Sequence, residues 1–563
     1  VACEACHGPG SKHVAWAEAA AMGRESQFDN GHFGLEVRLK DPGRGTWMVS
    51  PETGKGMRLA PLPARSEIET CARCHARRSV VWDEYIFGRP IMDSHRPALL
   101  VEGLYQADGQ ILEEVYVDGS FLQSRMYQKG VTCSDCHDPH SLGMIFPGDK
   151  VCRRCHAQST FETKSHHFHQ PGTPGAACVD CHMRDRNYMV VDPRHDHSMR
   201  IPRPNLTLEI GTPNACNDCH KEKSAQWSVD WVNKWYGPEA PKGLLGTKAL
   251  YAARTQTVDA ELRLRELIDD AEIPAIVRAT ALAELERYLT PGSMSLVGRS
   301  LGDPDPLVRM GALIAAQAMS AQDRIRLAYP LLDDPVRAVR VEATRLLAEV
   351  PGQAMTAEQR SRLAGALEEY RRSQLVDADR PEANVNLGWL ASRLGNLGNA
   401  ESYYRRAIEL DETFIPAYVN LADLYRMQER DAEGEQLLRS VLAEYPQSAE
   451  LHHVLGLSLV RLGRLDEALE LFAQAVELQP DAARYAYVYA VALYDSGRPK
   501  EAIAALEGAH QRMPTDFDIL SALVSYTMQE GNRQKSLLYA KKLLALRPGD
   551  ADLQRLIRQI ETS

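Results

Sequence analysis

The pattern Cys-x-x-Cys-His occurs six times in the first 220 residues of this 563-residue chain. One copy could arise by chance, but the six copies use every cysteine that the chain has. The paired cysteines are Cys3 and Cys6, Cys71 and Cys74, Cys133 and Cys136, Cys152 and Cys155, Cys178 and Cys181, and Cys216 and Cys219. The histidines that follow them are His7, His75, His137, His156, His182 and His220.

Each cysteine pair can form two thioether bonds to one haem, and the adjacent histidine can supply the proximal iron ligand. The alternatives account for less of the pattern. A disulfide framework needs no histidine after every second cysteine. Zinc ribbons combine two Cys-x-x-Cys units for each metal, and thioredoxin-like pairs occur singly. The sequence therefore predicts six covalently bound haem c groups.

Haem is attached to such motifs outside the cytoplasm, which predicts a periplasmic or extracellular, cell-surface location in a bacterium. The chain starts at Val1, two residues before the first motif cysteine, and shows no signal peptide. We therefore expect it to be a portion of a longer protein that carries an export signal and further haem sites.

Charge and hydropathy restrict the partners. The net charge is −11, and 25% of the residues are charged, which argues against a general nucleic-acid-binding protein. No run of 18 or more apolar residues predicts a transmembrane helix. The length predicts several domains.

The predicted fold is mainly α, with a loop-rich multihaem cytochrome c domain followed by an α-solenoid. The cytochrome domain covers residues 1–222, where short helices alternate with Gly- and Pro-rich loops and one β-excursion is expected over 111–122. A linking helix is expected over residues 223–257. Its stripe of Trp227, Trp231 and Trp235 should pack between domains, although an electron relay is an alternative.

Two kinds of helical repeat follow. Residues 258–380 show a period of 31 residues, marked by Val277-Arg278, Val308-Arg309 and Val339-Arg340, that resembles short HEAT-like repeats. Residues 381–563 show a 34-residue period typical of about five tetratricopeptide repeats (TPRs). The prolines in register are Pro446, Pro480, Pro514 and Pro548. We expect the TPR region to dock a redox partner or a neighbouring cytochrome subunit, and a homo-oligomer is an option.

Nine histidines of residues 1–220 lie outside the motifs and are available as distal iron ligands. His140 and His13 are too close to their own motifs to reach the far face of the same haem, so they would bind a neighbouring one. His167 and His169 would point to opposite sides of an extended segment. Met183, Met189 and Met199 are alternatives. The candidate distal ligands are His13, His32, His95, His140, His167, His169 and His197.

Three motif segments resemble known families. Residues 1–13 resemble the nitrifier tetrahaem cytochromes c, residues 131–140 the doubled Cys-x-x-Cys-His cytochromes, and residues 177–183 a motif of multihaem nitrite reductases. As a whole, the chain resembles large multihaem cytochromes fused to TPR domains. The resemblance implies further haem sites upstream and distal roles for His13 and His140. The chain lacks the Cys-x-x-Cys-Lys motif that marks the catalytic haem of pentahaem nitrite reductases.

Two functions remain open. The first is electron transfer through closely spaced, mostly bis-histidine haems, which the surplus of histidines favours. The second is a multihaem oxidoreductase that acts on a small nitrogen or sulfur species, such as nitrite, hydroxylamine or a sulfur oxyanion, at one open haem. The sequence does not identify catalytic residues.

Overall fold

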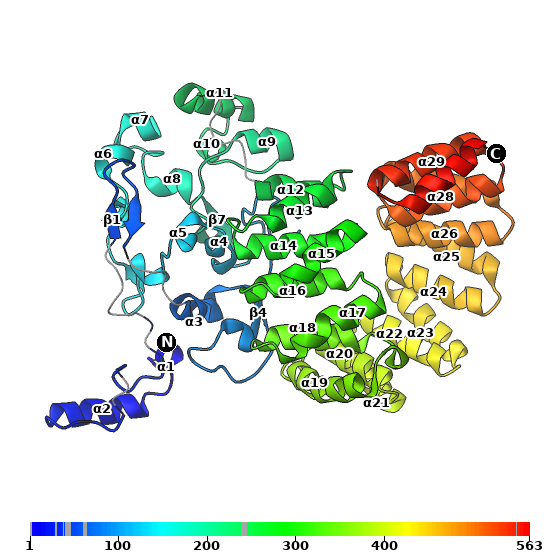
Figure 1. The fold of residues 1–563 in the computed structure, drawn as a ribbon, viewed down its shortest axis with the longest axis horizontal. Helices are drawn as coiled ribbons and strands as arrows, with labels where there is room; N and C mark the ends of the chain where they lie inside the picture. The colour runs from blue at the N-terminus through cyan, green and yellow to red at the C-terminus, as the bar shows by residue number, and fades with distance from the viewer. Residues whose placement is uncertain are drawn as a thin grey trace. The chain divides into compact units, whose positions relative to one another are not determined.

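The structure, a computed structural model, describes residues 3–28, 31–37, 39, 47–59, 65–237, 245–547 and 549–562. Helices dominate it, so the prediction of a mainly α fold is confirmed (Figure 1). The chain divides into two compact units, Val1–Arg254 with Glu261–Ala366, and Thr255–Ala260 with Leu367–Ser563. No helix in the described part is long and apolar enough to span a bilayer. Pro548 lies outside the described residues.

The cysteine-rich region consists of short helices and small sheets joined by loops. Its α-helices are α1 (Glu4–His7), α2 (Ser11–Ala21), α3 (Ser66–His75), α4 (Asp118–Leu122), α5 (Arg125–Gln128), α6 (Gln158–Phe161), α7 (Lys164–His167), α8 (Cys178–His182), α9 (Asn205–Ile210) and α10 (Ala215–Cys219). The 3-10 helices are η1 (Ile91–Asp93), η2 (Cys133–Asp135), η3 (Gly148–Lys150) and η4 (Cys152–Arg154). Every motif histidine therefore ends a short helix or follows one closely.

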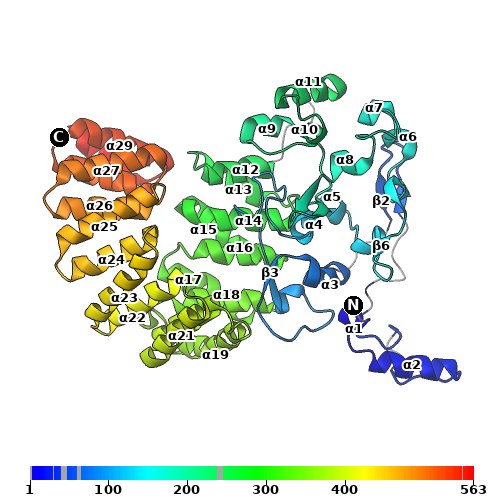
Figure 2. The ribbon, with the colours of Figure 1, turned by 180° about the vertical axis from the view of Figure 1, so that it is seen from behind.

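The strands of the described part pair into two-stranded antiparallel sheets (Figure 2). The pairs are β1 (Trp47–Val49) with β2 (Gly56–Arg58), β3 (Arg78–Val80) with β4 (His95–Pro97), β5 (His137–Asp138) with β6 (Gly143–Met144), and β7 (Asp185–Tyr188) with β8 (Asp192–His195). The β-excursion expected over residues 111–122 was wrong: Ile111 and Tyr116 form only isolated bridges, and α4 follows them.

Helical repeats follow the cysteine-rich region. Their α-helices are α11 (Ala225–Tyr236), α12 (Leu245–Arg254), α13 (Ala260–Asp269), α14 (Ala275–Leu285), α15 (Pro291–Ser300), α16 (Pro306–Ala316), α17 (Ala321–Ala328), α18 (Arg337–Ala348) and α19 (Ala357–Leu375). Three 3-10 helices are η5 (Glu286–Tyr288), η6 (Tyr329–Asp333) and η7 (Gly352–Ala354). The predicted linking helix thus corresponds to α11 and α12, and residues 238–244 between them lie outside the described part.

The 31-residue period has a structural basis in α14, α16 and α18, which contact one another in that order. Ala281, Ala312 and Ala343 are fully buried at equivalent positions of these helices. An ion pair also recurs: the guanidinium of Arg278 lies 2.7 Å from the Asp303 carboxylate, and that of Arg309 lies 2.7 Å from Asp334. Each pair ties one helix to the loop that precedes a later helix.

The cysteine-rich region packs directly on these helices within the same unit. The backbone N–H of Leu100 donates to Thr280 Oγ1 of α14 at 3.1 Å. Arg254 of α12 donates from Nη1 to the Tyr105 carbonyl at 2.9 Å. Leu100 and Tyr105 are 0% and 2% exposed, so apolar burial and buried hydrogen bonds both stabilise the contact. The helical repeats therefore pack against the cysteine-rich region and support it.

The second unit consists of helix pairs from α20 to α29, followed by α30. Their bounds are α20 (Pro381–Arg393), α21 (Leu397–Leu410), α22 (Ile415–Met427), α23 (Asp431–Glu444), α24 (Ala449–Arg461), α25 (Leu465–Leu478), α26 (Ala483–Asp495), α27 (Pro499–Arg512), α28 (Phe517–Gln529), α29 (Arg533–Leu546) and α30 (Ala551–Thr562). Consecutive helices contact each other throughout.

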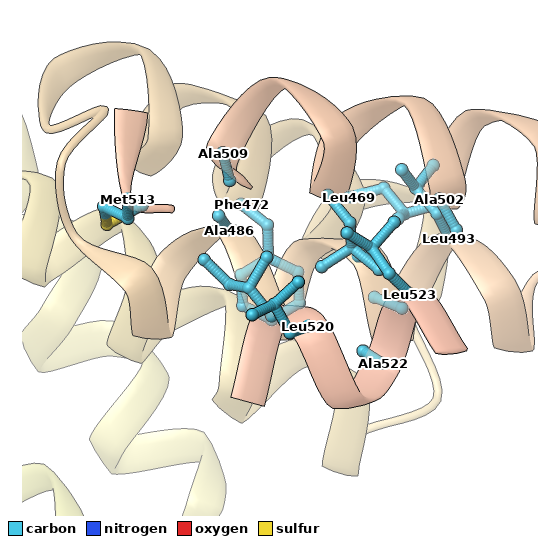
Figure 3. Close-up of a cluster of buried hydrophobic side chains, with 14 of the residues drawn as sticks. Leu469, Phe472, Ala486, Leu493, Ala502, Ala509, Met513, Leu520, Ala522 and Leu523 are labelled. Atoms are coloured by element: carbon cyan, nitrogen blue, oxygen red, sulfur yellow. The ribbon is translucent and has the colours of Figure 1, made fainter. Parts of the chain in front are cut away.

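Small residues allow the two helices of a pair to approach closely. A Cβ atom on Gly456 of α24 would lie 2.6 Å from the Phe472 ring of α25, and one on Gly388 would lie 2.5 Å from Tyr404. Real Cβ atoms do not approach so closely, so glycine is required at these positions. Figure 3 shows Phe472 inside the buried cluster with Ala486 and Leu520 from the following helices.

Candidate functional site

One cavity of about 3330 Å³ runs through the cysteine-rich region, and all twelve cysteines and all six motif histidines line it. A site for one small molecule usually has about 300–1,000 Å³. The cavity is therefore large enough for several bulky groups placed side by side. No disulfide joins these cysteines, all of which lie in the described residues.

Each motif lies next to the motif that follows it in the sequence. Cys71 of the second motif lies beside Cys133 of the third, and its proximity raises the pKa of the Cys133 thiol. Cys178 of the fifth motif likewise has a raised pKa because it lies beside Cys152 of the fourth. The remaining neighbours interact electrostatically, Cys6 with Cys71 and Cys74, Cys136 with Cys152 and Cys155, and Cys181 with Cys216 and Cys219. The motifs thus form an unbroken series.

Burial affects the chemistry of these thiols. It is the main cause that raises the pKa of Cys136 to about 11 and that of Cys181 to about 11. Burial thus disfavours a negative charge on these two sulfur atoms. A thioether sulfur carries no charge, so burial does not oppose it.

Four pairs of histidine rings face each other across this cavity. His7 and His140 have ring centroids 6.4 Å apart, with planes inclined by only 7°. The other pairs are His137 with His197 at 6.2 Å, His182 with His166 at 6.1 Å, and His220 with His169 at 6.3 Å. Each pair joins one motif histidine to one histidine outside the motifs.

The spacing of the four pairs matches two axial ligands on one metal ion. A histidine nitrogen binds a first-row metal at about 2.0–2.1 Å, and the ring centroid lies about 1.1 Å behind it, so two axial rings have centroids about 6.3 Å apart. Rings in direct van der Waals stacking would lie much closer. The donor set and its geometry therefore fit a haem iron between each pair.

The structure places His140, His169 and His197 opposite motif histidines. In each case the motif histidine belongs to a motif other than the one nearest in the sequence. His140 meets His7 rather than the nearby His137, in keeping with the argument that it cannot reach the far face of its own haem. His166 is the fourth partner, and the sequence reasoning did not select it.

The histidine cluster of residues 166–169 is not extended, so the condition under which His167 and His169 would point to opposite sides is not met. Residues Lys164–His167 form α7, and Phe168 ends it in the left-handed region with φ of 57°. The helical turn directs His166 toward His182, while His167 Nδ1 accepts a hydrogen bond from the His169 backbone N–H at 3.2 Å. His167 still lines the cavity, but no motif histidine stacks on it in the described residues.

His13, His32 and His95 do not line the cavity. His13 Nδ1 lies 2.7 Å from the Phe33 carbonyl, and its ring stacks on Trp16 of the exposed helix α2. His95 Nδ1 lies 2.8 Å from Ser94 Oγ, and burial lowers its pKa to about 4. His95 nevertheless lies near the second motif, because the charge of Arg73 contributes to lowering its pKa. The distal roles of His13, His32 and His95 therefore stay predictions.

Hydrogen bonds orient several of the paired rings. Nδ1 of His182 lies 2.6 Å from the Arg200 carbonyl, that of His197 lies 2.9 Å from the His195 carbonyl, and that of His169 lies 2.6 Å from the His167 carbonyl. A proton on Nδ1 leaves Nε2 as the nitrogen that can bind a metal. The backbone thus selects the tautomer that suits an axial ligand.

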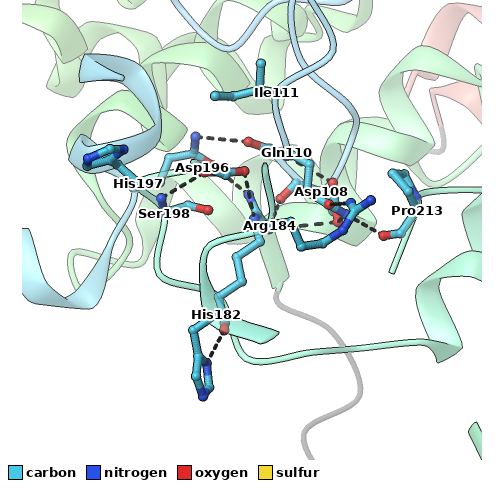
Figure 4. Close-up of polar contacts among 12 residues, drawn as sticks. Asp108, Gln110, Ile111, His182, Arg184, Asp196, His197, Ser198 and Pro213 are labelled. Atoms are coloured by element: carbon cyan, nitrogen blue, oxygen red, sulfur yellow. Dashed lines mark hydrogen bonds and ion pairs between the residues drawn. The ribbon is translucent and has the colours of Figure 1, made fainter. Parts of the chain in front are cut away.

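A polar network holds the segments that carry His182 and His197 (Figure 4). Arg184 Nη1 donates to Gln110 Oε1 at 2.6 Å, and Gln110 Nε2 donates to Asp108 Oδ2 at 2.7 Å. Asp196 Oδ1 accepts from the Ser198 backbone N–H at 2.8 Å. The network connects residues 108–110 to residues 182–198, which are distant in the sequence. It therefore helps to position the His182–His166 and His197–His137 ring pairs.

The tryptophan stripe of α11 packs on the cavity, so the prediction that it packs between domains was wrong. The Trp227 ring lies 4.9 Å from the His220 ring, and Trp235 stacks on Phe168 at 4.3 Å. All three tryptophans of the stripe line the cavity. They form an aromatic wall beside the sixth motif.

Asp118 is a cavity residue that the sequence reasoning missed. It begins α4, and burial raises the pKa of its carboxyl group to about 7. Its charge interacts with Cys71 and Cys133 of the second and third motifs. No sequence signal distinguishes it from the other aspartates of this region.

The tetratricopeptide repeat family matches residues 352–413, 391–457 and 453–516. The prediction of TPRs is therefore confirmed for residues 352–516. The match begins upstream of residue 381, where the sequence analysis placed the first repeat.

Among curated proteins, Protein CTR9 homolog of Arabidopsis thaliana is 26% identical over 125 residues, which are 22% of this chain and 12% of that protein. TPR repeat-containing protein YpiA of Bacillus subtilis is 24% identical over 157 residues, covering 28% of this chain and 37% of YpiA. Interferon-induced protein with tetratricopeptide repeats 3 of Mus musculus is 20% identical and covers 34% of this chain and 51% of its own length. The chain spans about half or less of these relatives.

Among solved structures, YrrB, described as a TPR protein with an unusual peptide-binding site, is 23% identical with a TM-score of 0.26, over 32% of this chain and 93% of YrrB. A MamA protein is 18% identical with a TM-score of 0.26, over 31% of this chain and 94% of its own. A thermophilic TPR protein of Thermus thermophilus is 21% identical with a TM-score of 0.26, over 32% of this chain and 100% of its own.

Proposed function

We propose that this chain is a multihaem c-type cytochrome that carries electrons, with a TPR region that docks a partner protein. The observation that carries the first part is the set of four histidine pairs, 6.1–6.4 Å apart, in a cavity that holds all twelve cysteines. The cofactor is haem c at six sites. The proposed location is the periplasm or the cell surface of a bacterium.

The residues of this chain would attach, orient and space the cofactors. Bound haem would supply the one-electron redox chemistry. The cysteine pairs hold each group covalently, and the paired histidines determine the ligand field of its iron. Because each motif neighbours the next, electrons would have short steps along the whole series.

The haem assignment is tested by counting haems in the exported protein with the pyridine haemochrome assay. We expect six per chain, and five in the double variant Cys133→Ser/Cys136→Ser, because that pair would bind one group. Ser134→Ala, between the same two cysteines, should retain six. A chain that contains zinc and no haem would contradict the proposal.

The TPR region would bind a redox partner or a neighbouring cytochrome subunit, since such repeats generally mediate protein–protein interactions. Deletion of residues 381–563 should abolish partner binding and leave the haem spectrum unchanged. Pull-down of the partner and optical spectra of both proteins measure the two effects. A changed haem spectrum would mean that the repeats instead support the haem-binding region.

A second function is supported by two motif histidines. In the described part of the chain, no other histidine stacks on His75 or His156. An iron without a distal histidine could bind a small nitrogen or sulfur species, as in a multihaem oxidoreductase.

A further inference from the structure

The six motifs fall into two groups, according to whether a second histidine ring faces the motif histidine. None of the residues outside the described part is a histidine, so the structure describes all eighteen of them. Four motif histidines have a ring partner at axial distance. His75 and His156 have no such partner among the described residues. Four irons would thus be bis-histidine and two would not.

Of these two, His156 lies in the more enclosed position. His75 is exposed, whereas His156 is half-buried. The Phe161 ring meets His156 edge-on at 5.4 Å and also meets His166 at 5.2 Å. Phe161 thus separates His156 from the nearest paired histidine.

A β-hairpin covers the cysteine side of this motif. The Ala157 backbone N–H donates to the Gly54 carbonyl at 2.8 Å. A Cβ atom on Gly56 would lie only 2.8 Å from Cys155 Cβ, so glycine allows the hairpin backbone to approach the motif. The hairpin turn carries Lys55, which lines the cavity.

Lys55 gives the surroundings of His156 a positive charge. Lys55 stands between Gly54 and Gly56, whose backbone contacts Ala157 and Cys155, and it lines the cavity that His156 also lines. That ammonium group has no ion pair in the described part of the chain. A cation at the edge of a partly enclosed site favours an anionic ligand.

The fourth motif also has a neighbour on each side in the series. Cys136 of the third motif interacts with Cys152 and Cys155, and Cys178 of the fifth motif lies beside Cys152. A ligand bound at the fourth motif would therefore be within reach of two further redox centres.

We infer that His156 marks the ligand-binding site of this protein: the iron that it would hold keeps its sixth position open and takes a small anion such as nitrite, attracted by Lys55. The inference rests on the proposed haem attachment and goes beyond it by naming the open site and its ligand class.

The first test is the spin state of the full chain, measured by electron paramagnetic resonance on the oxidised protein. We expect two high-spin and four low-spin irons for six haems. Nitrite should change one high-spin signal, and Cys152→Ser/Cys155→Ser should remove that signal. The control, Cys216→Ser/Cys219→Ser, removes a bis-histidine site that does not adjoin the fourth motif and should leave the nitrite response.

The second test separates charge from coordination without altering the motif. Lys55→Met should weaken nitrite binding about fivefold at low salt, because one nearby positive charge is lost. It should leave carbon monoxide binding unchanged, since that ligand is neutral, and Lys55→Arg should retain nitrite affinity.

The outcomes are distinguishable. Six haems that are all low-spin, or a methionine–iron charge-transfer band at the fourth motif, would overturn this inference and leave the cytochrome assignment standing. Equal nitrite affinity in Lys55→Met would overturn the role of Lys55. Absence of haem would overturn the proposed function itself.

Discussion

Replacing His166 with alanine should convert one low-spin iron into a high-spin iron, whereas His167→Ala should leave the spectrum unchanged. The His166 ring lies 6.1 Å from that of His182, as two axial ligands would. His167 instead accepts a hydrogen bond from the backbone of His169. The number of low-spin irons should therefore fall from four to three in the first variant only. Electron paramagnetic resonance and optical spectra of the oxidised proteins measure it.

His167→Ala is a matched control, because the two residues are adjacent in α7 and chemically identical. The carbonyl of residue 167, which faces His169 Nδ1, remains in that variant. Haem counts must be equal in both proteins. A high-spin signal in His167→Ala, with none in His166→Ala, would contradict the pairing.

Asp334→Ala should destabilise the unit that contains the helical repeats by about 3–5 kcal/mol, because it leaves a buried charge without its partner. Arg309 Nε and Nη2 donate to the two Asp334 carboxylate oxygens at 2.7 and 2.9 Å. The two side chains are only 10% and 3% exposed. Asp334 Oδ1 also accepts from the Val336 N–H at 2.8 Å, just before α18.

Chemical denaturation followed by circular dichroism measures this effect, read from the transition of that unit because the chain has two. Asp269→Ala is the control, since Asp269 and Arg299 form an exposed ion pair at 2.8 Å, with side chains 58% and 62% exposed. Its loss should cost about 0–1 kcal/mol. Equal losses in both variants would show that burial of the Arg309 pair does not matter.

The TPR region was predictable because its sequence signal repeats. A close helix pair requires a small residue opposite a large one, as at Gly456 and Phe472, and each repeat must meet the same requirement. A periodic pattern of this kind can be recognised even when the repeats share few identical residues. The same reasoning led to the 31-residue period, whose alanines are buried in α14, α16 and α18.

The tryptophan stripe shows where local pattern fails. Trp227, Trp231 and Trp235 fall on one helix face, as the spacing predicts, but spacing does not reveal what covers that face. The structure places them against His220 and Phe168. A helix pattern specifies which side is buried and not which surface buries it.

The sequence by itself determined the attachment chemistry that we propose and the repeat class, because both depend on residues close together along the chain. Only the tertiary structure decided which histidines meet. His7 and His140 lie far apart in the sequence, and the turn of α7 selects His166 over His167. The packing of loops on the helical repeats makes these choices. It leaves His75 and His156 without a stacked histidine ring in the part of the chain that is described. Ligand geometry is a long-range property of the fold, whereas covalent attachment is a short-range one.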